Sequence, residues 1–163
     1  MKSKDPLATS GLPAMKPTDD EQHHLAVEKD RENGSQYLIL VADDSADSSA
    51  MISLFLQQQG YRVVTATNGE DAIKIASQTM PNLILMDISM PTLDGLGATR
   101  RIREDETLRD IPIIAVTAFG TEGFQRAAYD VGVSGYLTKP LDLDRMGHLI
   151  ARLLSPSGSG NLT

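Results

Sequence analysis

The chain has 163 residues, of which 40% are hydrophobic and 23% are charged, with no cysteine and a formal net charge of -7. This length allows one hydrophobic core with tails and excludes two ordinary domains, while the absence of cysteine excludes disulfides and thiolate metal sites. The acidic balance disfavours direct binding to nucleic acid or to anionic membranes. No apolar run is long enough to cross a membrane and the amino terminus has no signal-peptide core, so we expect a soluble, cytoplasmic protein.

Residues 1–35 mix polar and charged residues with few large apolar side chains, and they are predicted to be a disordered amino-terminal extension. Thr18 and Glu21 have the spacing of a helix capping box, which favours a short helix after them. A solvated charged segment that is helical only part of the time is favoured over a stable short helix by about two to one. His23 and His24 project to different faces of a helix and make a poor metal pair.

From residue 37 onwards, short apolar runs of strand type alternate with helical patterns. Strands are expected at residues 37–44, 61–67, 83–87, 111–117 and 134–138. Helices are expected after Ser45 or Asp47 as the cap, over 70–78, over 96–105, over 121–131 and from Leu143 onwards. The first helix is expected to end at Gly60, with its apolar face made by Met51, Ile52, Phe55 and Leu56. The second helix is expected to bury Ala72, Ile73 and Ala76, and the last Leu143, Met146, Ile150 and Leu153.

Five strands that alternate with five helices through short connections predict an α/β fold with a five-stranded parallel sheet. The strands read as continuous apolar runs because helices cover both faces of such a sheet. The common arrangement for this pattern is the flavodoxin-like (βα)5 fold with strand order 2-1-3-4-5. The predicted domain covers residues 36–154, followed by a flexible tail at 155–163 that is rich in Ser and Gly.

Polar residues stand at the carboxyl ends of four of these strands. Asp43 and Asp44 end the first strand, Asp87 the third, Thr117 the fourth and Lys139 the fifth. The first and third strands are predicted neighbours about 4.8 Å apart, so three carboxylates converge at one edge of the sheet. Taken singly, each residue has an ordinary structural explanation as a helix cap, a strand residue or a solvated loop charge. Their joint placement at one edge favours a functional site.

The residue types at this edge indicate phosphoryl chemistry. Three clustered carboxylates repel one another, and an all-oxygen set of ligands favours Mg²⁺. Thr117 offers a hydroxyl and Lys139 a positive charge, which suit a group with several anionic oxygens. Asp87 is the most central acid and has a cation on either side, so we predict that it attacks phosphorus and forms an aspartyl phosphate.

Four motifs resemble those of the receiver domain of two-component response regulators, over residues 37–154. They are the acid pair in VADD, the sequence LMDISMPTLDG, VTA at 116–118 and YLTKP at 136–140. The resemblance implies that Asp87 is phosphorylated, that Asp43 and Asp44 organise Mg²⁺ and that the backbone carbonyl of Ser89 is a further ligand. It also implies that Thr117 and Lys139 bind the phosphoryl group.

Three further residues follow from the resemblance. Tyr136 matches the switch aromatic of the family, which turns inward when Thr117 moves toward the phosphoryl group. Lys139 and Pro140 are expected to be joined by a cis peptide bond. Phe119, two residues past Thr117, is bulky, and we predict that it shields the acyl phosphate from water. The alternative, that Phe119 packs against the helix over 121–131, has about even odds.

The implied function is a signalling switch. A histidine kinase or a phosphotransfer protein would phosphorylate Asp87 and so change partner binding through the helix over 121–131, the fifth strand and the last helix. We expect no output domain after the receiver, output through an unknown downstream protein, and a monomer or weak dimer. Such a domain assists its own phosphorylation and dephosphorylation and is not a turnover enzyme.

Two rival functions use related residues. A phosphohydrolase of the haloacid dehalogenase type also has an Asp nucleophile, Mg²⁺ and a Lys, but its nucleophile comes first in the chain and its acid pair last. Here that order is reversed, and Ser89 stands where those enzymes have a general acid. A binding-only pseudo-receiver is the third possibility, but such proteins usually lack members of the site.

Overall fold

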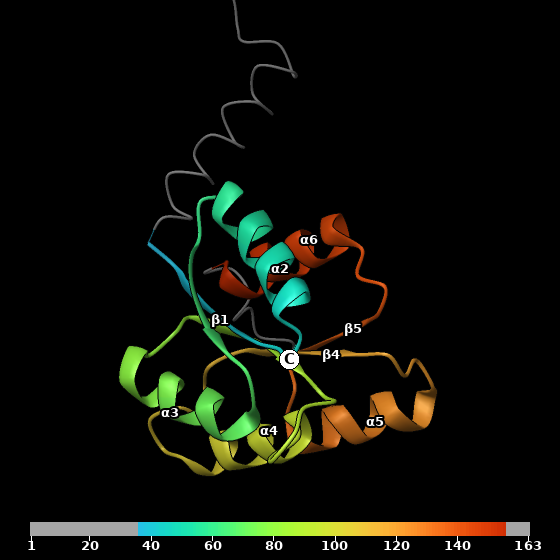
Figure 1. The fold of residues 1–163 in the computed structure, drawn as a ribbon. Helices are drawn as coiled ribbons and strands as arrows, with labels where there is room; N and C mark the ends of the chain where they lie inside the picture. The colour runs from blue at the N-terminus through green and yellow to red at the C-terminus, as the bar shows by residue number, and fades with distance from the viewer. Residues whose placement is uncertain (1–35, 156–163) are drawn as a thin grey trace, which may run out of the picture.

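The computed structural model describes residues 36–155. The predictions for residues 1–35, including the short helix after Thr18, lie outside the described residues, as does all but the first residue of the predicted tail. Five parallel strands form one sheet in the order β2-β1-β3-β4-β5, which confirms the predicted order and fold class (Figure 1). The strands are β1 (Leu38–Ala42), β2 (Arg62–Ala66), β3 (Leu83–Asp87), β4 (Ile113–Thr117) and β5 (Gly135–Thr138).

Each strand is followed by a helix, and these helices cover both faces of the sheet. They are α2 (Ala46–Gln58), α3 (Gly69–Thr79), α4 (Gly95–Glu104), α5 (Glu122–Val131) and α6 (Leu143–Leu154). Figure 1 shows α2 and α6 on one side of the sheet and α3, α4 and α5 on the other. Alternating residues of the strands therefore face two separate apolar cores.

The core beneath α2 and α6 buries only part of the apolar face predicted for the first helix. Ile52 and Leu56 of α2 are buried beside Met146 and Ile150 of α6, as expected. Met51, which the sequence pattern assigns to the same face, is 48% exposed. Apolar residues lie on more than one side of α2, so their spacing alone overstates the buried face.

Side-chain caps stand at the start of four of the five helices within residues 36–155. Ser45 caps α2, and its side chain accepts a hydrogen bond from the backbone N–H of Ser48. Asp94 caps α4, which begins at Gly95, one residue before the predicted start. A Cβ at Gly95 would stand 2.2 Å from the backbone oxygen of Asp87, so the missing side chain lets α4 begin directly against the end of β3. This close approach places the turn after β3 next to the predicted site.

Strand β4 begins at Ile113, two residues after the predicted start. Pro112 has no N–H to donate to a sheet, although its carbonyl accepts a hydrogen bond from the N–H of Ile84. Gly60 adopts a φ of 93° after α2, which only glycine adopts readily, and so confirms the predicted end of that helix. Within residues 36–155, no helix is long and apolar enough to cross a membrane.

Candidate phosphoacceptor and metal site

Three carboxylates meet at the carboxyl edge of the sheet, as the strand order requires. Asp43 and Asp44 follow β1 and Asp87 ends β3, and one ligand oxygen from each lies within 4.8 Å of the others. Asp43 and Asp87 are each only 3% exposed, whereas Asp44 is exposed to solvent. We call this cluster of acids and its surroundings the pocket; its negative charge is buried at Asp43 and Asp87 and open to solvent at Asp44.

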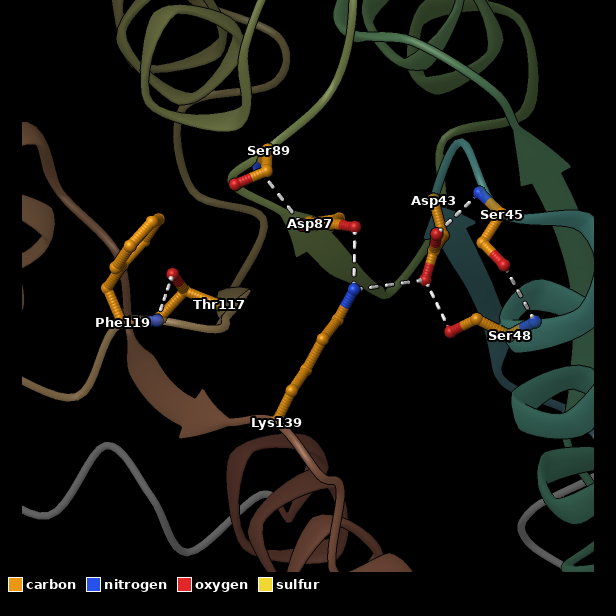
Figure 2. A network of polar contacts seen from close by, with 8 residues as sticks. All are labelled: Asp43, Ser45, Ser48, Asp87, Ser89, Thr117, Phe119 and Lys139. Atoms are coloured by element: carbon orange, nitrogen blue, oxygen red, sulfur yellow. Dashed lines mark hydrogen bonds and ion pairs between the residues drawn. The ribbon is translucent and has the colours of Figure 1, made fainter.

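Asp87 is held by two donors from different parts of the chain (Figure 2). The backbone N–H of Ser89 donates to Asp87 Oδ1 at 3.0 Å, and Lys139 Nζ donates to Asp87 Oδ2 at 2.9 Å. Burial nevertheless raises the pKa of Asp87 above its ordinary value, because these two donors and the charge of Lys139 do not offset the lost hydration and the repulsion from Asp43. The surroundings therefore disfavour the charged form of Asp87, and added positive charge would stabilise that form.

Lys139 supplies the cation of the pocket from the end of β5. Its backbone N–H bonds to the carbonyl of Thr117 at 2.8 Å, and its Nζ lies 3.8 Å from Asp43 Oδ2. Burial alone would lower the pKa of Lys139, but the hydrogen bond to Asp87 and the nearby acids raise it instead. The peptide bond between Lys139 and Pro140 is cis, as expected.

Asp43 is held from helix α2. The backbone N–H of Ser45 donates to Asp43 Oδ1 at 2.8 Å, and the hydroxyl of Ser48 donates to Asp43 Oδ2 at 2.6 Å. Sequence reasoning missed Ser48. The available signal was its position in the first turn of the helix that follows the acid pair, which brings its side chain back toward the end of β1.

Thr117 lies at this edge, but its hydroxyl is engaged with its own loop. The side chain is fully buried, and Oγ1 accepts a hydrogen bond from the backbone N–H of Phe119 at 3.1 Å. Tyr136, predicted as a switch aromatic, is only 7% exposed, and its hydroxyl donates to the carbonyl of Phe119. Burial raises the pKa of Tyr136, and a hydrogen bond to Thr117 offsets part of that rise. Thr117 and Tyr136 therefore both contact the loop between β4 and α5.

Phe119 packs in the way that the alternative interpretation described. Its ring stacks on Phe124 of α5, with centroids 5.1 Å apart, and is half exposed. Figure 2 shows Phe119 on the far side of Thr117 from Asp87. Shielding of an acyl phosphate by this ring stays a prediction, which the hydrolysis rate of phosphorylated Phe119→Ala would test.

The pocket fits a divalent metal ion by the chemistry of its donors. Three carboxylates face one ammonium group, which leaves an excess of negative charge, and all candidate ligands are hard oxygens. The backbone of Ser89 stands beside Asp87, where its carbonyl was predicted to be a further ligand. Asp43, Asp44 and Asp87 would hold Mg²⁺ at this edge.

With this geometry established, comparison with known proteins identifies the class. The family model of the response regulator receiver domain matches residues 39–151. The chain belongs to this family, and it therefore carries the receiver domain of a two-component system.

Individual relatives agree with this assignment but differ in length. The chain is 36% identical over 116 residues to the DNA-binding dual master transcriptional regulator RpaA of Synechocystis, covering 71% of this chain and 48% of that protein. It is 33% identical over 107 residues to the polar-differentiation response regulator DivK of Brucella anthropi, covering 66% of this chain and 87% of that protein. The chain thus spans about half the length of RpaA and most of the length of DivK.

Solved structures share the fold, and one of them contains a magnesium ion. The receiver domain of the sensor histidine kinase PA1611 from Pseudomonas aeruginosa matches with a TM-score of 0.68 and 34% identity, covering 72% of this chain and 97% of that one. That structure has a magnesium ion coordinated in its active-site cleft. The chemotaxis protein CheY4 of Vibrio cholerae matches with a TM-score of 0.69 and 27% identity, covering 72% and 98% of the two chains.

Proposed function

We propose that this chain is a phosphorylation-dependent switch in which Asp87 accepts a phosphoryl group from a histidine kinase or a phosphotransfer protein. The observation that carries the proposal is the contact of Lys139 with Asp87, 52 residues apart in sequence, inside a cluster of acids that fits Mg²⁺. Asp43, Asp44, Asp87 and the Ser89 carbonyl are the proposed metal ligands. The family membership supports this assignment.

The residues of the pocket divide the work of phosphoryl transfer. Asp87 is the nucleophile: one carboxylate oxygen forms a bond to phosphorus while the bond from phosphorus to the donor breaks and the donor keeps that electron pair. The Ser89 N–H holds Asp87 Oδ1, which leaves Oδ2, on the side of Lys139, to attack. Bound Mg²⁺ would neutralise charge on the transferred oxygens. Lys139 then exchanges the Asp87 carboxylate for a phosphoryl oxygen.

Thr117 connects the pocket to the rest of the molecule. A hydroxyl donates and accepts at the same time, so Thr117 can donate to a phosphoryl oxygen while its Oγ1 accepts from the N–H of Phe119 at 3.1 Å. Tyr136 holds the carbonyl of the same residue, so the loop between β4 and α5 responds to both side chains. Inverting a 1:99 ratio of two states takes about 5.5 kcal/mol, which a few charge-assisted hydrogen bonds approach.

The proposed output surface lies beside Tyr136, over α5, β5 and α6. A cavity of about 330 Å³ lies between α5, β5 and α6, and its lining includes Tyr136 and Tyr129. Arg145 and Arg152 also line it, and neither forms an ion pair with any residue of the described range 36–155. A downstream protein with acidic groups fits this surface, because Arg145 and Arg152 offer positive charge that no acid within residues 36–155 pairs with.

A labelling experiment tests the proposed function. Incubation with acetyl phosphate and Mg²⁺ should label the protein with about one phosphoryl group per chain, and Asp87→Asn should abolish the label. Asp94→Asn is the matched control, because Asp94 caps α4 outside the pocket and Asn caps equally well. Label that persists in Asp87→Asn would contradict the proposal. Steady turnover of phosphate esters would favour the dehalogenase-type phosphohydrolase instead.

The remaining parts of the proposal concern the setting of the switch. We infer that it works in the cytoplasm as a monomer or weak dimer, with protein partners and without direct contact to nucleic acid or membrane. The receiver fold and the negative net charge support this setting. Sedimentation of the unphosphorylated and phosphorylated forms at micromolar concentration would measure the oligomeric state.

A further inference from the structure

A serine outside the predicted site makes the shortest contact to a proposed metal ligand. The hydroxyl of Ser48, in the first turn of α2, donates to Asp43 Oδ2 at 2.6 Å (Figure 2). Asp43 is only 3% exposed, so this bond forms on a carboxylate that has little access to water. A hydrogen bond of this length to a buried charged oxygen is among the stronger ones in proteins.

The bond completes the support of Asp43. Oδ1 accepts from the N–H of Ser45 at 2.8 Å, and Oδ2 faces both the Ser48 hydroxyl and Lys139 Nζ, the latter at 3.8 Å. Without Ser48, Oδ2 would have only the more distant ammonium as a partner. Loss of that bond would leave the Asp43 carboxylate freer to rotate about its χ2 torsion.

We propose that Ser48 is a positioning residue for the metal site, which holds the Asp43 carboxylate in the orientation that binds Mg²⁺. The inference rests on the proposed function, because Asp43 acts there as a metal ligand. Groups that orient metal ligands through hydrogen bonds typically change metal affinity about 10- to 100-fold when they are removed. Ser48 does not touch the metal or the phosphoryl group in this assignment and acts only through Asp43.

A purely local role in capping α2 is the competing explanation, and the chain offers variants that separate the two. The side chain of Ser45 caps α2 by accepting from the N–H of Ser48 at 3.3 Å, while the contact of Ser45 with Asp43 uses its backbone N–H. Ser45→Ala therefore removes the cap and keeps the bond to Asp43. Ser49 is the matched control for Ser48: a partly exposed serine of the same helix with no side-chain bond among those found in residues 36–155.

The test measures the dissociation constant of Mg²⁺ by isothermal titration calorimetry on the full chain, with no phosphodonor present. Ser48→Ala should weaken Mg²⁺ binding about tenfold, and Ser48→Thr, which keeps the hydroxyl, should bind within about twofold of the parent. Ser45→Ala should lower the melting temperature and leave Mg²⁺ affinity within about twofold. Ser49→Ala should change neither quantity.

The outcomes that overturn the inference are distinct from those that overturn the proposed function. Unchanged or tighter Mg²⁺ binding in Ser48→Ala, or failure of Ser48→Thr to restore it, overturns the positioning role. Equal losses in Ser45→Ala and Ser48→Ala overturn it in favour of helix capping. Absence of Mg²⁺ binding and of Asp87 labelling in the parent protein overturns the proposed function itself.

Discussion

Two partly buried cations lie at opposite edges of the same sheet, and they contact different kinds of partner. Lys139, after the carboxyl end of β5, contacts the carboxylates of Asp87 and Asp43. Arg103, near the end of α4, donates to three backbone carbonyls, those of Gly132 at 2.8 Å, Arg109 at 2.9 Å and Ile111 at 2.8 Å. These carbonyls belong to the segments that lead into β4 and β5, at the amino edge of the sheet.

The difference lies in whether the partners can be exchanged. Under the proposed function, the carboxylates of Asp87 and Asp43 would bind a metal ion and release Lys139 when Asp87 is phosphorylated, so the contacts of Lys139 could be replaced without moving the backbone. The backbone carbonyls that accept from Arg103 have no alternative partner of this kind among residues 36–155. Burial lowers the pKa of Arg103, which the nearby Asp110 partly offsets, and the guanidinium stays charged because its ordinary pKa is so high. The contacts of Lys139 are therefore proposed to be exchangeable, whereas those of Arg103 make a fixed edge.

The largest expected effect is at the fixed edge. Arg103→Ala should lower the free energy of unfolding by about 3 kcal/mol, because three carbonyls lose a charged donor. Arg103→Lys should recover less than half of the loss, since an ammonium group lacks the planar fork of guanidinium. Urea unfolding measures both values. Labelling of Asp87 at low temperature should remain intact in both variants, and its loss would mean that the two edges are not independent.

Lys139 should give a smaller loss that a metal ion reverses. In chelator, Lys139→Met should lower the free energy of unfolding by about 2 kcal/mol, because Asp87 and Asp43 lose their shared cation. Adding millimolar Mg²⁺ should remove most of the deficit, because the ion supplies the missing positive charge. Arg103→Ala, measured in parallel, should gain no more from Mg²⁺ than the parent protein. Equal rescue of both variants would remove the distinction between the two edges.

The smallest expected effect is a gain in stability on removing the charge of Asp87. Burial raises the pKa of this group above 3.8, so the folded state binds the proton more tightly than the unfolded state does. Stability contributed by the group therefore falls as the pH rises from 3.8 through the raised pKa, and it stays low above that value. In Mg²⁺-free buffer at neutral pH, Asp87→Asn should be more stable than the parent by about 1 kcal/mol.

The pH dependence of that gain provides the check. The difference between Asp87→Asn and the parent should grow between pH 3.8 and the raised pKa, and it should be constant above it. Urea unfolding across this range measures it, with Asp94→Asn as the control outside the pocket. A variant that is less stable than the parent at neutral pH would show that the bond from Lys139 outweighs the cost of burying the carboxylate.

Much of this molecule follows from local sequence patterns. Apolar runs that end in Asp43, Asp87 and Thr117 indicate buried parallel strands with polar carboxyl ends, and the alternation with helices leads to the strand order that brings those ends together. The cap of the first helix, expected at Ser45 or Asp47 and found at Ser45, is readable because capping is a contact between residues a few positions apart. The sheet order, the convergence of the three acids and the approach of Lys139 were therefore accessible before any coordinates.

What only the tertiary structure decided are contacts that depend on side-chain direction. The hydroxyl of Ser48 turns to Asp43 and the ring of Phe119 turns to Phe124, while Met51 stays exposed on a helix whose apolar residues do not share one face. The guanidinium of Arg103 donates to carbonyls from three loop positions. Sequence spacing specifies which element a residue belongs to, but the rotamer and the partner are chosen by packing among elements that are distant in the chain.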